Sequence, residues 1–377
     1  GYSIYDMVFP NPASDDFGLY RSGETKNELM NAPQSWRDKY GIYTRKFSVL
    51  NYLITGPFLQ RDNLAKYSTK YSKMVDIIRQ SLIGARGDIQ HCKKIMIYHD
   101  RVKMSGVLII QEILKANGIL DEYSEPIDGT LCMRCGRDMN WHNIHLRQDA
   151  ADVEVDGIIN HQFRACRFIM AHSDMEKIQM DQALVKYNSP DNKFGEQFTI
   201  LVGSKIIKES FNFKAVQEYI ITSLPVNIPT LIQVLGRCIR KNSHAGLPPH
   251  ARRVNIHLLV STFNKKVRNL DTTALSPELY RYVDKILDYD VIQRIEAEIN
   301  KNAIDADIHR DIVMSTDLKK TYFPNWPSTE GGPVKVLGNL YFDPTYSLPP
   351  ISAADLNLST FTAYKYGIEE ARQCATL

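Results

Sequence analysis

The stretch "EYIITSLPVNIPTLIQVLGRCIRKNSH" (218–244) places a short apolar segment ahead of a longer one that carries a glutamine and two arginines. Its beginning is typical of a buried strand, and its end, 231–244, favours a helix. In a helix, Gln233, Arg237 and Arg240 lie in one narrow wedge, because they follow one another at i, i+4 and i+7. Apolar residues cover most of the other faces, so the helix should be largely buried. Two such arginines need an anionic partner, and the segment offers no carboxylate at helical spacing.

Short apolar segments and helices alternate on both sides of this stretch. Val107, Ile110 and Leu114 share one face of the first expected helix, and Gly118 is its expected end. The alternation predicts an α/β fold, a parallel sheet with helices on both faces. The expected strands are 93–98, 166–171, 197–203, 218–223 and 253–261, and the expected helices between them include 105–118 and 175–188.

A length of 377 residues indicates more than one structural unit. We expect a partly helical connecting segment at 1–90, the α/β domain at 91–262 and a mainly helical extension at 263–377. The segment 119–165 interrupts the alternation and is expected to be an insertion that folds through interactions of its own. The sequence begins with glycine rather than methionine and ends in an apparently helical stretch, which predicts a piece of a longer protein.

Composition excludes several classes of protein. Hydrophobic content of 44% and charged content of 24% are ordinary for a globular chain, and the net charge of +3 is mild. Any contact with nucleic acid must therefore come from local patches. No apolar run spans a bilayer, and the start does not resemble a signal peptide. Only one pair among the six cysteines is closely spaced, which favours a reducing compartment over a disulfide framework.

The insertion contains a C-x-x-C pair followed by histidines, a pattern that suits tetrahedral zinc. A loop without a core gains folding energy from such a metal, so we expect a structural site. His161 is the preferred fourth ligand because it would join the two ends of the insertion, and His145 and Cys166 are alternatives. Two incidental free thiols or a redox dithiol are the other interpretations. The expected zinc ligands are Cys132, Cys135, His142 and His161.

The segment "QVLGRCIR" (233–240) has the spacing Q-x-x-G-R-x-x-R and lies between the fourth and fifth expected strands. It resembles motif VI of superfamily 2 helicases, whose two arginines point at the terminal phosphate of a nucleotide. The resemblance implies that Arg240 is an arginine finger, that Arg237 and Gln233 assist it, and that Gly236 lies beside the nucleotide. Guanidinium suits this role through its permanent charge and planar fork. An interface helix whose arginines pair with carboxylates elsewhere is the alternative.

The segment "GSKIIKESFN" (203–212) follows the third expected strand and resembles helicase motif V. The resemblance implies that Ser204 and Lys205 touch nucleic-acid phosphates and that Asn212 couples this contact to the nucleotide. The chain differs from the usual pattern at Ser210, where glycine is common, and at Asn212, where aspartate is common. A strand-to-helix loop capped by Ser204 is the plainer alternative.

The segment "IMIYHDRVKMSGV" (95–107) resembles motif IV, in which side chains and a helix N-terminus face the nucleic-acid backbone. The resemblance assigns nucleic-acid contacts to His99 and Arg101, and a solvated turn is the alternative. Motifs IV, V and VI would then follow one another in order along the strands of one sheet.

The block 203–244 as a whole is similar to the second helicase lobe of large cytoplasmic DNA viruses, namely the African swine fever virus helicases and the small subunit of the poxvirus early transcription factor. The similarity extends over roughly residues 90–377. It implies an ATP-dependent motor on DNA or RNA that acts in early viral transcription, in the viral factory of the host cytoplasm and in the virion. The implied partners are a first helicase lobe, the viral RNA polymerase and a second transcription-factor subunit.

The sequence contains no G-x-x-x-x-G-K-[ST] loop, and its Asp121–Glu122 pair lies in the insertion rather than at a strand end. ATP and magnesium would then be bound mainly by a first lobe, and this chain alone should be inactive. The competing hypothesis is a zinc-containing module that binds nucleic acid or acts as a transcription factor without catalysis. Retention of both arginines favours the motor.

Overall fold

The computed structural model describes residues 6–7, 9–10, 17–18, 34–40, 43–46, 52–103, 105–146, 154–205, 211–240, 242–262, 276–301, 335–337 and 340–341. These residues belong to two compact units. The first comprises Gly1–Pro225 and Gln233–Ser261, and the second comprises Val226–Ile232 and Thr262–Leu377. The larger part of the expected C-terminal extension lies outside the described residues, as does Ser210.

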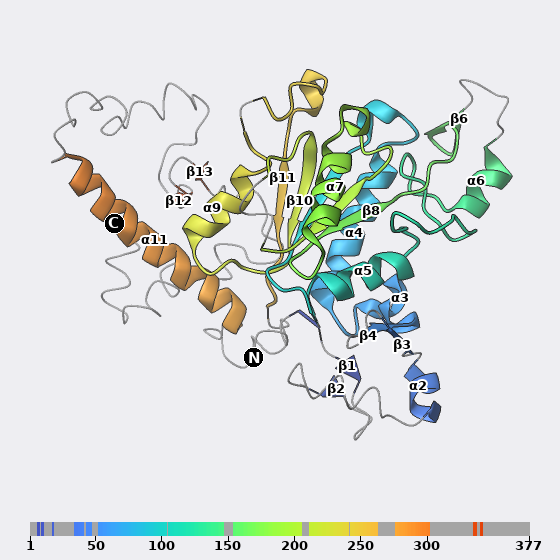
Figure 1. Cartoon of the computed structure of the whole chain (residues 1–377), viewed down its shortest axis with the longest axis horizontal. Coiled ribbons are helices and arrows are strands. Elements are labelled where there is room, and N and C mark those ends of the chain that lie inside the picture. The colour runs from blue at the N-terminus through green and yellow to red at the C-terminus, as the bar shows by residue number, and fades with distance from the viewer. Residues whose placement is uncertain are drawn as a thin grey trace. The chain divides into compact units, whose positions relative to one another are not determined.

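A five-stranded sheet forms the centre of the first unit (Figure 1). Its order is β11-β10-β5-β9-β8, and every neighbouring pair is parallel. The predicted α/β fold with a parallel sheet is therefore confirmed, and each strand lies inside or within two residues of its expected segment. The strands are β5 (Lys94–Tyr98), β8 (Phe168–Ala171), β9 (Ile200–Gly203), β10 (Val216–Ile221) and β11 (Asn255–Leu258).

The helices of this unit that the argument uses are α4 (Thr69–Gly84), α5 (Val107–Ala116) and α7 (Lys177–Asn188). Side chains of a strand alternate between its two faces. Ile95 and Ile97 of β5 pack in one core with α4 and α5. Met96 points to the opposite face, where its Sδ lies 3.4 Å from Sγ of the buried Cys238. Both faces of the sheet are therefore covered, as a doubly wound fold requires.

Part of the segment expected to connect domains belongs to this same core. Phe58, Tyr71 and Ile78 are buried in the cluster that includes the sheet. Ser68 caps α4 by accepting a hydrogen bond of 3.0 Å from the amide of Tyr71. The other elements of this region are β1 (Phe9–Pro10), β2 (Phe17–Gly18), α2 (Gln34–Tyr40), β3 (Tyr43–Lys46), β4 (Tyr52–Thr55), η2 (Pro57–Leu59), α3 (Arg61–Leu64) and η3 (Ile89–His91).

The insertion folds around a small cluster of its own, made by Cys132, Cys135, Leu146 and Ile158. It is attached to the end of α4, because the amide of Gly87 donates to the carbonyl of Arg134 at 2.8 Å. Gly87 has φ +90, and a Cβ there would lie 2.3 Å from the carbonyl oxygen of Ile159, so only glycine fits. The described elements of the insertion are α6 (Met139–His145), β6 (Glu154–Val155) and β7 (Ile158–Ile159).

The remaining elements are η4 (Pro190–Asn192), α9 (Ile228–Gly236), η5 (Pro249–Ala251), α11 (Pro277–Lys301), β12 (Lys335–Leu337) and β13 (Leu340–Tyr341). Within the second unit, Lys285 of α11 donates to the carbonyl of Val226 at 2.6 Å. Among the residues that the structure describes, none of the helices has the length and apolar character needed to cross a membrane.

Candidate functional site

The carboxyl ends of the parallel strands bring together the residues predicted to contact nucleic acid. Tyr98 is in register with Gly203 on one side and with Ile221 on the other. The turns that follow these strands therefore lie side by side at one edge of the sheet. Ligands of open α/β sheets bind outside this edge.

Ser204 and Lys205 lie at this edge, directly after β9. The amide of Ser204 donates to the carbonyl of Ala171 at 3.0 Å, which fixes its backbone. Its hydroxyl is buried and has no hydrogen-bond partner in the described part of the chain. Lys205 is exposed. The turn thus combines an unsatisfied hydroxyl with a solvated cation.

His99 follows β5 at the same edge, but its side chain is turned into the protein. It is fully buried, and its Nδ1 accepts a hydrogen bond of 3.0 Å from the amide of Arg101. The other ring nitrogen lies 3.3 Å from Oδ2 of Asp6. His99 therefore presents no atom to a ligand in this structure, and Arg101 is half-buried.

The N-terminus of α5, which the motif IV resemblance placed at the nucleic acid, is filled by the preceding turn. The amide of Val107 donates to the carbonyl of Arg101 at 3.0 Å, and that of Leu108 donates to the carbonyl of Val102 at 3.1 Å. These amides are the ones that bind anions at open helix ends. The helix start therefore does not offer the anion site that the sequence suggested.

The predicted helix over 231–244 is shorter than expected. α9 ends at Gly236, so Arg237 and Arg240 lie in the turn after it and do not share a helical wedge with Gln233. Gln233 and Arg240 are exposed and Arg237 is half-buried, so the expectation of buried arginines was wrong. Cys238, in the turn that follows the helix, is completely buried.

The residues predicted to face the nucleotide gather before β10, at the opposite, amino edge of the sheet. The amide of Phe213 donates to the carbonyl of Arg237 at 2.8 Å, which joins the end of the motif V segment to the motif VI turn. Asn212 is exposed, and its carbonyl accepts from the Asn188 side chain at 2.9 Å. A Cβ on Gly236 would meet nothing within 4 Å, so packing inside the chain does not require this glycine.

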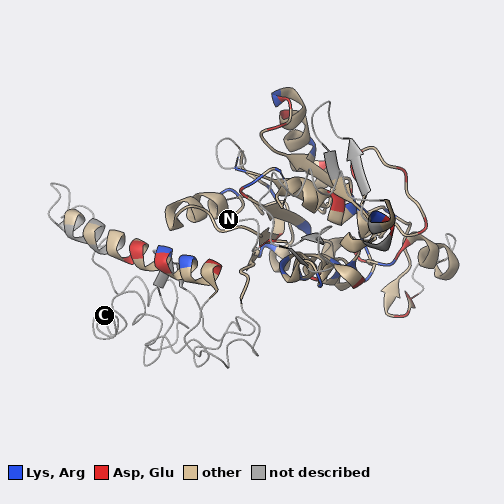
Figure 2. Cartoon of the chain, turned by 90° about the horizontal axis from the view of Figure 1, so that it is seen from below, with Lys and Arg blue, Asp and Glu red and all other residues tan. Residues whose placement is uncertain are grey.

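Neither Arg237 nor Arg240 forms an ion pair with any of the described residues. Arg240 instead donates from Nε to the carbonyl of Gly236 at 3.1 Å, which ties its stem to the end of α9. Charges of both signs are interspersed along the described ribbon (Figure 2). Both guanidinium groups are therefore cations that an external anion can approach. The planar fork of a guanidinium group suits the oxygens of a phosphate or carboxylate.

The insertion brings the four predicted zinc ligands together. The candidate ligand atoms of Cys132, Cys135, His142 and His161 all lie within 4.8 Å of one another, and the first three residues are buried. Nε2 of His161 lies 3.4 Å from Sγ of Cys132 and 3.3 Å from Nε2 of His142. We refer to these four residues as the Cys/His cluster.

Local geometry explains how the cluster is built. Gly136 has φ +68 directly after Cys135, and its amide donates to the carbonyl of Cys132 at 2.9 Å, which forms a tight turn between the sulfurs. Asp138 caps α6 by accepting from the amide of Trp141, and the helix carries His142. Nδ1 of His161 contacts the carbonyl of Ile159 at 2.7 Å, which turns Nε2 toward the other ligands.

The two alternatives for the fourth ligand lie outside the cluster. His145 is exposed and stacks on Trp141, with 4.6 Å between the ring centroids. Cys166 is completely buried, and burial raises the pKa of its thiol to about 12. By contrast, hydrogen bonds from Cys135, His142 and His161 lower the pKa of Cys132 despite its burial, so its thiolate is the favoured form.

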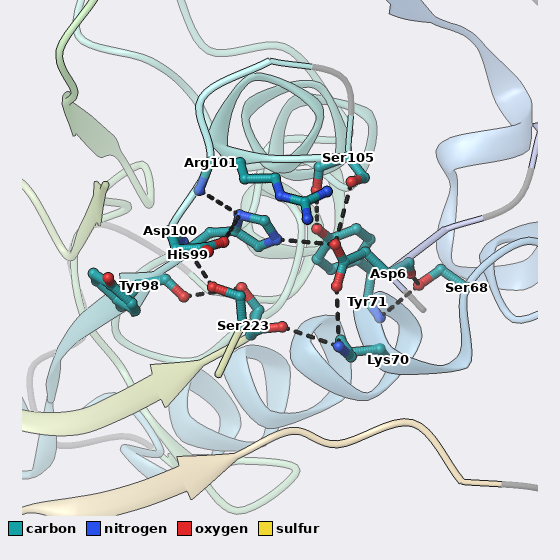
Figure 3. A network of polar contacts seen from close by, with 11 residues as sticks. Asp6, Ser68, Lys70, Tyr71, Tyr98, His99, Asp100, Arg101, Ser105 and Ser223 are labelled. Atoms are coloured by element: carbon teal, nitrogen blue, oxygen red, sulfur yellow. Dashed lines mark hydrogen bonds and ion pairs between the residues drawn. The ribbon is translucent and has the colours of Figure 1, made fainter. Parts of the chain in front are cut away.

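No sequence pattern indicates one further feature, the contact of Asp6 with Lys70 and His99 (Figure 3). Asp6 lies 93 positions before His99, and no motif marks it. Of the partners Lys70 and His99, only His99 belongs to a sequence motif, and the motif IV resemblance predicts that this ring faces outward, toward nucleic acid. A buried carboxylate of this kind has no local spacing pattern that could reveal it.

The chain is similar to several known helicase-related proteins. The profile of the family described as "Helicase conserved C-terminal domain" matches residues 144–242, which include Ser204 and both motif VI arginines. The early transcription factor large subunit homolog of African swine fever virus (isolate Pig/Kenya/KEN-50/1950) is 37% identical over 100% of this chain and 30% of its own length. Its name refers to the large subunit, which corrects the resemblance to the small subunit of the poxvirus factor.

Two other relatives are more distant. A putative ATP-dependent RNA helicase of Acanthamoeba polyphaga mimivirus is 24% identical over 95% of this chain and 34% of its own length. Nucleoside triphosphatase I of Choristoneura biennis entomopoxvirus is 36% identical over 23% of this chain and 13% of its own length. Among solved structures, the C-terminal part of the Fun30 ATPase domain aligns with a TM-score of only 0.32 at 12% identity, covering 57% of this chain and 49% of that one.

The chain spans about a third of the length of the swine fever and mimivirus relatives. The conserved helicase domain, the similarity along the whole chain and the parallel sheet all point to the same family. Residues 144–242 thus match the helicase conserved C-terminal domain, and the whole chain is similar to the early transcription factor large subunit homolog of African swine fever virus.

Proposed function

We propose that this chain is the second motor lobe of an ATP-dependent helicase or translocase that acts in early viral transcription. Its place of action would be the viral factory in the host cytoplasm and the virion, with the viral RNA polymerase or a second transcription-factor subunit as partner. The name of the swine fever virus relatives supports the link to transcription. The names of the mimivirus and entomopoxvirus relatives support nucleotide hydrolysis.

The observation that carries the proposal is the pair of arginines after α9. Arg237 and Arg240 lack carboxylate partners among the described residues and lie beside Gly236, whose Cβ position is open. In the complete protein, Arg240 would act as the arginine finger on the terminal phosphate, with Arg237 and Gln233 holding the nucleotide. ATP and magnesium would be bound mainly by a preceding lobe.

The nucleic-acid contact of the proposed motor lies at the opposite edge of the sheet. The exposed ammonium of Lys205 suits a phosphate, which carries negative charge, and the neighbouring Ser204 hydroxyl, buried and without a partner among the described residues, would donate to the phosphate after turning outward. Asn212, at the other end of the same segment, would face the nucleotide. Contact through His99 requires a rearrangement, so we assign the phosphate contact to the turn after β9 first.

We also propose that the Cys/His cluster holds one structural zinc ion. Its donor set of two sulfurs and two imidazole nitrogens is that of closed zinc sites. The hydrogen bonds that favour the thiolate of Cys132 provide the ligand form that a metal needs. Bound zinc would supply folding energy to an insertion whose own apolar cluster is small, without a role in hydrolysis.

The cluster also favours the second candidate function, a zinc-containing nucleic-acid-binding or transcription-factor module without ATP turnover. The two functions make different predictions for the complete protein. A motor should hydrolyse ATP faster when duplex or single-stranded nucleic acid is added, whereas the isolated chain should hydrolyse none. Steady-state phosphate release from both preparations is the test. A complete protein that binds nucleic acid but releases no phosphate would identify the module instead.

A further inference from the structure

Asp6 lies beside His99 at the start of the turn that follows β5 (Figure 3). Its Oδ1 pairs with Nζ of Lys70 at 3.0 Å, and its Oδ2 accepts from the hydroxyl of Ser105 at 3.2 Å. Oδ2 also lies 3.3 Å from Nε2 of His99. All four residues are buried, so the contacts form a closed polar network inside the first unit.

The hydrogen bonds fix the proton position on His99. The backbone amide of Arg101 is an obligate donor, and it points at Nδ1 from 3.0 Å. Nδ1 must therefore be the acceptor nitrogen of a neutral ring, and the proton must lie on Nε2. The group facing Nε2 is the carboxylate of Asp6, which can only accept. Asp6 thus matches the one tautomer that the turn requires.

Asp6 is suited to remain a carboxylate in this position. Burial alone would raise its pKa, but the hydrogen bond from His99, together with the hydrogen bond and charge of Lys70, outweighs burial and lowers the pKa. Asp100 Oδ1 lies 3.6 Å from Nδ1 of His99, so the ring has carboxylates on both sides. Because Nδ1 accepts from the Arg101 amide, the ring proton lies on Nε2, the nitrogen that faces Asp6.

The same bonds continue into α5. The carbonyl of Arg101 accepts from the amide of Val107 at 3.0 Å, and the amide of Asp100 donates to Oγ of Ser223 at 2.7 Å. A bond path therefore runs from Asp6 through the His99 ring to the backbone of the turn and to the first turn of the helix. This turn carries Arg101, and it lies beside Ser204 at the carboxyl edge.

We propose that Asp6 is a positioning residue for the nucleic-acid-binding edge: through His99 it sets the backbone of residues 100–103 and hence the direction of the Arg101 side chain. The nucleic-acid part of this inference rests on the proposed function. The segment that precedes the sheet in the chain would therefore take part in substrate binding without touching the substrate.

Nitrogen-15 spectra of the histidine rings test the positioning directly, with His99→Gln used to assign the signal. Wild type should show neutral His99 with its proton on Nε2. Asp6→Ala should remove this preference and raise the exchange rate of the Arg101 amide by about tenfold, the equivalent of one hydrogen bond. Asp6→Asn keeps an acceptor oxygen but loses the charge, so it should preserve most of the tautomer. Should Asp6→Ala fail to fold, the wild-type spectrum still tests the proposal, because a proton on Nδ1 would contradict it.

Ser68→Ala is the matched control, because Ser68 contacts the backbone carbonyl of Asp6 and caps α4 without touching His99. It should lower stability while leaving the ring signal unchanged. A wild-type proton on Nδ1, or an Arg101 amide that exchanges equally fast in Asp6→Ala and wild type, would overturn the proposal.

Affinity for a fluorescent DNA duplex separates this inference from the proposed function. Asp6→Ala should weaken binding by about fivefold, as expected for one misplaced charged contact, and should add nothing in an Arg101→Ala background. Independent, additive losses would contradict positioning through Arg101. An Arg101→Ala variant that binds like wild type would contradict the nucleic-acid role of the turn. The tautomer experiment is independent of this result and would still test the contact between Asp6 and His99.

Discussion

The backbone amide of Phe213 and the backbone carbonyl of Arg237 are joined by a hydrogen bond of 2.8 Å. This bond holds the end of the motif V segment against the turn of motif VI at the amino edge of the sheet. Ser204, at the start of the same segment, lies at the carboxyl edge beside Ala171. One segment thus reaches both proposed sites, which gives a physical route by which nucleic-acid contact could affect nucleotide contact.

Gly236→Ala should separate packing from function. A Cβ at this position meets nothing within 4 Å, and alanine is favoured over glycine in a helix by up to about 1 kcal/mol, so thermal stability should be unchanged or slightly raised. ATP turnover of the complete protein should fall, because the methyl group would occupy the space that we assign to the nucleotide. Gly84→Ala at the end of α4, which also meets nothing within 4 Å, is the matched control and should leave turnover unchanged.

Lys205→Ala should reduce the salt dependence of nucleic-acid binding. Loss of one phosphate contact lowers the slope of log affinity against log salt concentration by about one. Lys193 is also exposed but precedes β9, at the opposite edge of the sheet, so Lys193→Ala should leave the slope unchanged. Fluorescence anisotropy titrations at several salt concentrations provide the measurement. Equal slopes for both variants would remove the assignment of Lys205.

The sheet could be predicted from the sequence because each strand is a short apolar run that needs no distant partner to be seen. "KKIMIY" (93–98) became β5 with all of its residues buried. The end of α9 could not be predicted, because Cys238, buried against Met96 of β5, continues the helical spacing of buried residues past Gly236. Local periodicity continued beyond Gly236, and tertiary packing overrode it.

The candidate sites divide in the same way. Sequence spacing correctly grouped Cys132, Cys135 and His142, because the turn and α6 that hold them are local. It could not show that His99 faces inward, since the partner that turns the ring is Asp6, far away in sequence. When a polar side chain is buried against a carboxylate far away in sequence, no periodicity in the sequence reveals the contact.

Zinc content should distinguish ligands from bystanders. Protein purified without chelator should contain about one zinc ion per chain. Cys135→Ser and His161→Ala should lose the metal and make the insertion sensitive to protease while the parallel sheet remains folded. Cys166→Ser and His145→Ala lie outside the cluster and should retain it. Metal-free wild type with a protease-resistant insertion would show that the four residues are incidental.

Lys94 should make stability depend on pH. Burial lowers its pKa to about 7 from the ordinary 10.5, although Nζ donates to the carbonyls of Tyr187 and Lys214. Between these values the unfolded chain binds the proton that the folded chain has released, so raising the pH favours folding. The free energy of unfolding should rise by about 1.4 kcal/mol per pH unit from this group.

The Lys94→Met variant should lack that rise. Tyr187 keeps a partner in this variant, because its carbonyl also accepts from the side chain of Asn192 at 3.0 Å. Urea unfolding of both proteins at a series of pH values above 7, the folded-state pKa of Lys94, gives the slope of unfolding free energy against pH for each. Parallel curves would show that Lys94 remains protonated in its buried position.

The central claim, that Arg240 completes an ATPase site on another lobe, is tested most directly by steady-state ATP hydrolysis of the complete protein carrying Arg240→Ala. Turnover should fall by roughly 10³-fold or more with little change in KM, because an arginine finger stabilises charge that develops in the transition state. Arg237→Ala should instead raise KM. Arg253→Ala, an exposed arginine beyond the motif VI turn, should change neither constant. An Arg240→Ala protein whose turnover stays close to wild type would contradict the claim.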